Sequence, residues 1–153
     1  MYKNRSQALI LSSSRGFTLI ELLVVIAIIG ILSAVVLASL NTARSKGNDA
    51  AIQSDLSTIQ TQAEIFYGGA GGNTYTGVCA ESTVAKAIAA AEVANGSGTV
   101  VCNVAANGTA YAVSSGLQAG ITIGGATNMY WCVDSTGNAK SHASALGAAT
   151  ACP

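Results

Sequence analysis

The stretch that decides the fold lies near the N-terminus, where residues 15–32 read RGFTLIELLVVIAIIGIL. It opens an apolar run over residues 17–40, 24 residues in which Glu21 is the only charged side chain. A helix of about 20 apolar residues crosses the ~30 Å hydrocarbon core of a bilayer. The run therefore predicts a membrane-spanning helix. Lys3, Arg5 and Arg15 precede it and predict a cytoplasmic N-terminus with an extracytoplasmic C-terminal part.

The same stretch resembles the N-terminal signature of type IV pilins and of the related pseudopilins of type II secretion. The resemblance rests on Gly16, on Phe17 directly after it, on Glu21 and on the apolar run. It implies that a membrane-embedded prepilin peptidase cuts between Gly16 and Phe17 and that the new Phe17 amine is methylated. It also implies that an assembly ATPase and an inner-membrane platform protein move the subunit from the membrane into a helical filament.

A carboxylate within a membrane helix needs an explanation, because it costs about 2.5–3.5 kcal/mol on insertion scales. One explanation for Glu21 is an assembly role. The ammonium group of Phe17 on a neighbouring subunit would pair with it away from water and would set the register between subunits. The alternative is that Glu21 reaches the lipid headgroups from its place near the helix end.

Helical periodicity continues beyond the apolar run. Apolar residues recur at steps of three and four along an otherwise polar segment, namely Ile52, Leu56, Ile59, Ala63 and Phe66. Gly68 and Gly69 then end the helix. We therefore divide the chain into a leader peptide (1–16), a transmembrane or filament-core half-helix (17–40), an amphipathic half-helix (41–67) and a globular head (68–153).

The head has the signals of a small α+β domain. Residues 82–94 are rich in alanine and predict a helix that stops at Asn95-Gly96. Residues 100–105 and 109–114 predict two strands around the turn Asn107-Gly108, with further strands over 128–134 and 139–142. The glycines at 116, 120, 124 and 125 predict a loop. The expected fold class is α+β, with the long N-terminal helix packed by its amphipathic half against a small antiparallel sheet.

Cysteine usage indicates an oxidising compartment. Four cysteines follow the apolar run, and an even number without a CxxC pair favours two disulfides over a structural zinc site. Three connectivities are possible. Cys79–Cys102 and Cys132–Cys152 are favoured because each closes a local loop, and each such loop would contribute about 3 kcal/mol.

Candidate chemistry in the head is sparse. His142 is the only histidine, and no nucleophile-elbow motif supports a Ser-His-Asp triad that would include Asp134. We therefore expect His142 at the surface and no enzymatic activity. Oxygen atoms of Asp134, Ser135 and Asn138 suit Ca²⁺, but a plain polar turn is preferred, so we expect no metal and no cofactor.

The charge balance argues against nucleic-acid binding. Removal of residues 1–16 would leave four basic and seven acidic side chains, a net charge of −3. Phosphate backbones attract basic surfaces, so a mildly acidic mature protein is a poor match.

The leading interpretation is a structural subunit of a type IV pilus-like surface filament, or fimbrium, built as a homo-oligomer. Before assembly the chain would be a single-pass membrane protein with its head outside the cytoplasm. A pseudopilin of a type II secretion or DNA-uptake system is the nearest alternative. A monomeric binding module on a membrane anchor is the alternative from a different class.

Overall fold

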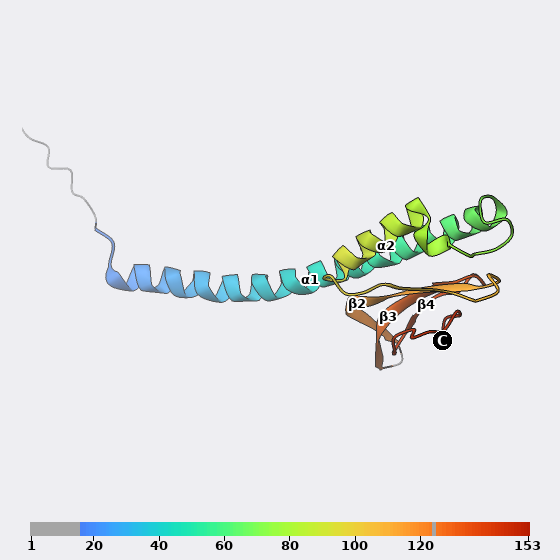
Figure 1. Cartoon of the computed structure of the whole chain (residues 1–153). Helices are drawn as coiled ribbons and strands as arrows, with labels where there is room; N and C mark the ends of the chain where they lie inside the picture. Colours follow the sequence, from blue (N-terminus) through green and yellow to red (C-terminus); the bar gives the residue numbers. More distant parts are fainter. Residues whose placement is uncertain (1–15, 124) are drawn as a thin grey trace, which may run out of the picture. The chain divides into compact units, whose positions relative to one another are not determined.

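The computed structural model describes residues 16–123 and 125–153 (Figure 1). Apart from Gly16, the expected leader over residues 1–16 lies outside the described residues, as does Gly124. The chain divides into two compact units, Met1–Ala38 and Ser39–Pro153. The second unit contains the sheet and the buried core.

Helix α1 runs from Leu19 to Gly68 and passes through Gly30 and Gly47 without interruption. It is long and apolar enough to cross a membrane by length and composition. Its start lies two residues beyond Phe17 because Thr18 caps it, as described below. At its end, the N–H groups of Gly69 and Gly71 both bond to the Phe66 carbonyl, at 3.2 and 2.7 Å. The helix therefore ends at the glycines, as predicted.

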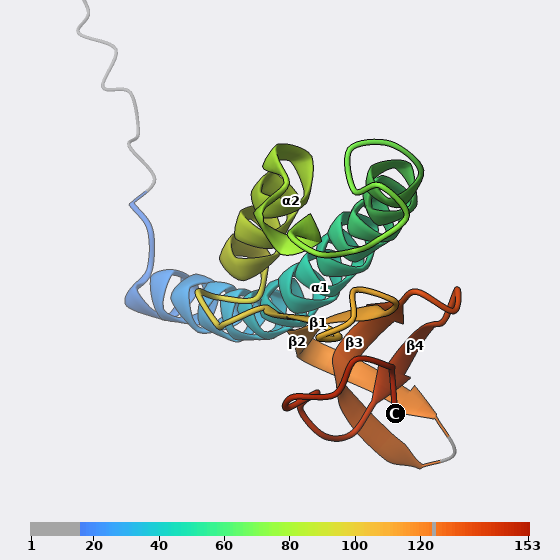
Figure 2. The ribbon, with the colours of Figure 1, turned by 45° about the vertical axis from the view of Figure 1, so that its right-hand side comes forward.

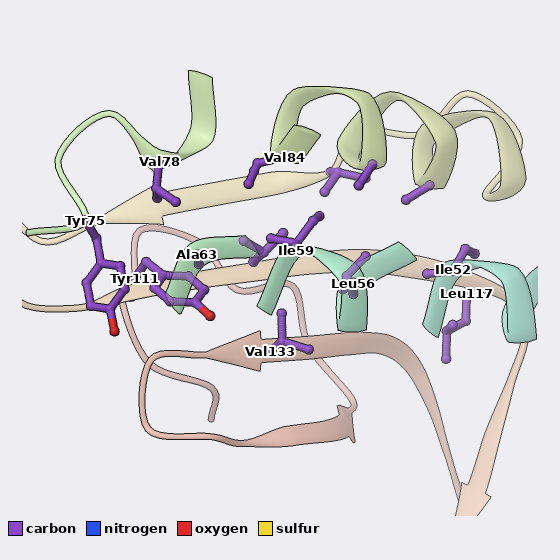
Figure 3. Close-up of a cluster of buried hydrophobic side chains, with 14 residues drawn as sticks. Ile52, Leu56, Ile59, Ala63, Tyr75, Val78, Val84, Tyr111, Leu117 and Val133 are labelled. Atoms are coloured by element: carbon purple, nitrogen blue, oxygen red, sulfur yellow. The ribbon is translucent and has the colours of Figure 1, made fainter. Parts of the chain in front are cut away.

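The apolar stripe of α1 forms the centre of the core in the second unit, as the periodicity predicted. Ile52, Leu56 and Ala63 have no exposed surface. Figure 3 shows side chains of α1 directed both toward Val84 of helix α2 and toward Val133 of the sheet. Burial of such side chains contributes about 1.5–3 kcal/mol each, so this stripe attaches the head to the helix.

Helix α2 spans Ser82–Ala94, the range that the sequence predicted, and a short 3-10 helix, Val78–Ala80, precedes it. The Glu81 carboxylate caps α2 by accepting bonds from the N–H groups of Thr83 and Val84, at 2.8 and 2.9 Å. The apolar face of α2 joins the same core cluster as α1.

Among the described residues, four strands form one antiparallel sheet in the order β1-β2-β3-β4 (Figure 2). They span Val101–Val104, Tyr111–Ile123, Ala126–Asp134 and Ala139–His142. Alternate residues face opposite sides. Val113 and Val133 contact the core around α1, whereas Ala112 and Cys132 form a second cluster with Leu146 on the other side, here called the outer face.

The prediction of a loop at the glycines of residues 116–125 is wrong for most of this segment. Strand β2 continues through Gly116 and Gly120 to Ile123, with a register shift between Gly116 and Ile121. Gly120 has a φ of 73°, and a Cβ there would meet the Met129 sulfur at 2.7 Å. The glycines therefore permit a bulge and a close strand approach rather than ending the strand.

Both disulfides have the favoured connectivity. Cys79 is bonded to Cys102 and Cys132 to Cys152, with sequence separations of 23 and 20. The first links the segment before α2 to β1, and the second links β3 to the C-terminal segment.

Candidate functional site

The proposed cleavage site lies just before α1. Gly16, Phe17 and Thr18 have no regular secondary structure, and Phe17 is 90% exposed. A Cβ at Gly16 would meet no atom of the described chain within 4 Å. Packing within the isolated chain therefore does not require glycine at this position. A peptide bond outside the helix can also enter a protease site without unwinding helical hydrogen bonds.

Glu21 forms a capping box with Thr18. Its Oε2 accepts bonds from the Thr18 backbone N–H at 2.9 Å and from the Thr18 hydroxyl at 2.8 Å. The Glu21 N–H in turn donates to the Thr18 hydroxyl oxygen at 3.2 Å. These reciprocal bonds satisfy backbone donors at the helix start.

This capping role of Glu21 was not predicted from the sequence, although the Thr-x-x-Glu spacing at the start of an apolar run is its known signature. The cap uses only one carboxylate oxygen. Oε1 of Glu21 has no hydrogen bond to the rest of the described chain. Glu21 can therefore cap its own helix and still accept a bond from another molecule.

The apolar residues at positions 17–40 are exposed in the single chain. The exposed fractions of the large apolar side chains run from 48% for Val24 to 90% for Phe17. A continuous apolar surface of this size requires a lipid or protein environment. Together with Glu21, it forms a mostly apolar helix surface whose only charged side chain is a carboxylate near its start.

The residues considered for Ca²⁺ form a closed polar turn around Asp134. Its Oδ1 accepts bonds from the Thr136 hydroxyl at 2.6 Å and the Thr136 N–H at 2.9 Å. Its Oδ2 accepts bonds from the Asn138 side chain at 3.0 Å and the Cys152 N–H at 2.8 Å. Burial raises the pKa of Asp134, but these hydrogen bonds outweigh burial and lower the pKa to about 2. The carboxylate thus ties the β3–β4 turn to the C-terminal segment.

The expectation that His142 lies at the surface is wrong. The side chain is buried, with only 7% of its surface exposed. Its Nε2 lies 3.1 Å from the hydroxyl oxygen of Ser114, which is itself 2% exposed. Asp134 does not complete a triad, because its carboxylate bonds to the turn and to Cys152. Both the serine and the histidine are more than nine-tenths buried, so a substrate could not reach them.

Comparisons with known proteins match only part of the chain. Residues 11–37 match the family described as the prokaryotic N-terminal methylation motif. A curated relative, the type IV wide pilus major component PilA4 of Thermus thermophilus, is 44% identical over 54 residues. The matched region covers 35% of this chain and 41% of that relative's length. No solved structure matches the chain.

Proposed function

We propose that the protein is a structural subunit of a type IV pilus-like surface filament, because residues 11–37 match the N-terminal methylation motif and part of the chain is similar to a type IV pilus component. A prepilin peptidase cuts the precursor between Gly16 and Phe17, and the new Phe17 amine is methylated. An assembly ATPase and an inner-membrane platform then move the subunit into a homo-oligomeric filament.

The observation that carries this proposal is the exposed apolar half of α1 with Glu21 at its start. The precursor can place this helix surface in a membrane, with the head outside the cytoplasm. After assembly the same surface would pack against copies of itself. Repetition of one heterologous contact that does not close produces an open helical polymer.

Within this polymer, Glu21 pairs with the Phe17 amine of a neighbouring subunit. Cleavage creates that amine, so the pairing is available only to processed chains. Oε1 of Glu21, which bonds to no other group of the described residues, can accept the bond while Oε2 keeps its contacts with Thr18. A charged pair shielded from water is strongly favoured over either charge alone. Subunits out of register would leave both charges unpaired.

The head forms the outer surface of the filament. Two disulfides and the buried stripe of α1 hold the sheet and α2 on the helix. Disulfides persist in oxidising compartments, which agrees with a head outside the cytoplasm.

The proposal is tested with three variants of the full chain in the cells that express it: Glu21→Ala, Glu21→Gln and Thr18→Ala. Glutamine keeps an oxygen for the capping box but removes the charge. Thr18→Ala removes the cap and keeps the carboxylate. We expect both Glu21 variants to reduce the subunit in sheared filaments at least about tenfold, since breaking a shielded ion pair costs several kcal/mol.

Thr18→Ala should stay close to wild type in sheared filaments, because loss of a cap costs only about 1 kcal/mol. The amount of each variant in the membrane fraction, measured by immunoblot, controls for expression. If Thr18→Ala reduced filaments as much as Glu21→Ala while Glu21→Gln assembled normally, Glu21 would act only as a cap. Normal filaments from all three variants would contradict the assembly role.

A further inference from the structure

His142 closes the outer face of the sheet at the end of β4. Its ring stacks on Tyr130 of β3, with ring centroids 5.6 Å apart and an interplanar angle of 28°. Its Nε2 reaches the Ser114 hydroxyl of β2 at 3.1 Å. The imidazole therefore lies across three strands and is more than nine-tenths buried.

The second ring nitrogen of His142 is unsatisfied. Nδ1 is buried and has no hydrogen-bond partner in the part of the chain that the structure describes. Burial lowers the pKa of His142, and the positive charge of Lys140 lowers it as well. The Ser144 backbone favours the charged ring and raises the pKa in part. Protonation would place a second N–H and a positive charge in this buried site.

Among the residues that the structure describes, no carboxylate bonds to the ring to compensate that charge. The groups that face the ring are the Ser114 hydroxyl of β2, the Tyr130 ring of β3 and Lys140 of β4. Residues 143–153 contain no Asp, Glu, Lys, Arg or His. Asp134 lies on β3 as well, but its oxygens are bonded to the turn and to Cys152.

His142 is also the residue at which β4 ends and residues 143–151, here called the C-terminal strap, begin. The strap packs on the outer face through Leu146, which is 5% exposed and clusters with Ala112 and Cys132. Asn103 donates through its side-chain nitrogen to the carbonyls of Gly147 and Ala149, both at 2.8 Å. The Cys132–Cys152 disulfide fixes the far end of the strap.

We propose that His142 is an acid-sensitive latch: its neutral imidazole holds the C-terminal strap on the outer face, and protonation releases the strap. The Ser144 backbone lies beside the ring, so water can reach the charged imidazole once the first residues of the strap move away. Release would expose the apolar cluster around Leu146. The disulfide keeps the far end attached, so the opening is local and reversible. This inference does not depend on the filament role.

The direction of the effect follows from linkage. A buried histidine with a lowered pKa stabilises the closed strap at pH above the ordinary histidine value near 6.5. Below that value, each pH unit favours the open, protonated state by up to about tenfold, until the closed site itself takes up the proton.

The test is hydrogen exchange measured by mass spectrometry on the untagged full chain in detergent micelles, at about pH 7.5 and about pH 5.5, the range in which histidines titrate. Rates are corrected for the intrinsic effect of pH. We expect protection of residues 143–151 to fall several-fold at the lower pH, while α2 in the same sample stays unchanged. His142→Gln should remove the pH dependence. Asp55→Asn, which alters a half-buried carboxyl on α1, should keep it.

A strap whose protection does not change with pH, or an equal change in His142→Gln, would overturn the proposal. A second readout needs only wild-type protein. Since His142 is the only histidine, its imidazole signal in an NMR titration is unambiguous. We expect it to titrate below the ordinary value, over the pH range in which the strap loses protection. A titration at or above the ordinary value near 6.5 would also overturn the latch.

Discussion

The carboxylate of Asp49 on α1 accepts a 2.6 Å hydrogen bond from the backbone N–H of Gln118 in β2. Its second oxygen accepts bonds from the N–H groups of Ala119 and Gly120, both at 3.0 Å. These donors lie within the register shift of β2, where the regular pairing with β3 is interrupted. Asp49 therefore supplies the acceptors that the bulge removes and connects the middle of β2 to α1.

We predict that Asp49→Ala lowers the free energy of unfolding by roughly 3 kcal/mol, because three backbone donors lose a charged acceptor. Asp49 is 4% exposed, so water cannot readily replace the carboxylate. Denaturant unfolding followed by circular dichroism measures the change. Asp55→Asn on the same helix is the matched control and should remain within about 0.5 kcal/mol of wild type. An Asp49→Ala variant as stable as that control would contradict this role.

Asp134 should make the stability of the head depend on acid pH. Burial raises the pKa of Asp134, but its hydrogen bonds lower the pKa by more. The folded value of about 2 therefore lies below the unfolded one. The contribution of Asp134 to the free energy of unfolding is then complete above about pH 4 and is lost as the pH falls toward about 2. We expect Asp134→Asn to lower the free energy of unfolding by about 2 kcal/mol near pH 7 and by much less near pH 2.

Urea unfolding of the wild type and of Asp134→Asn across this pH range tests the prediction. The difference between the two proteins cancels any contribution from His142, which both retain. A difference in stability that stays constant from neutral to acid pH would show that the low pKa of Asp134 does not stabilise the fold.

The two disulfides close loops of similar length but should restrain different segments of the head. Replacing either cysteine pair by alanine should lower the free energy of unfolding by about 3 kcal/mol. Loss of Cys132–Cys152 should also increase hydrogen exchange in the C-terminal strap, because that disulfide and the Cys152 N–H fix its far end. Loss of Cys79–Cys102 should leave the strap protected in native conditions. Equal exchange of the strap in both variants would contradict this division.

Local signals were sufficient for several elements. Alanine-rich residues followed by Asn95-Gly96 predicted α2 with both ends correct. The three- and four-residue spacing from Ile52 to Ala63 predicted the buried face of α1. The disulfide pairing was also predicted correctly, because each bond joins cysteines that are close along the chain.

Other features depend on contacts that sequence spacing does not contain. The second half of β2 was predicted as a loop, but pairing with β3 and the distant Asp49 carboxylate hold it as a strand. His142 was expected at the surface because nothing local indicates its contacts with Ser114 of β2 and Tyr130 of β3. The Thr18–Glu21 cap had a local signal, but the apolar run dominated the interpretation of Glu21.

The most direct test of the central claim is mass spectrometry of filaments sheared from cells that express this chain. Trypsin cuts after Arg15, before the proposed processing site, and after Arg44, beyond the apolar run. The account predicts an abundant peptide over residues 17–44 that begins at a methylated Phe17, in the sheared fraction. The same peptide found only in the cell envelope would contradict a surface filament and favour a pseudopilin. A peptide beginning at Gly16 in every fraction would show that the chain is not processed and would contradict the account as a whole.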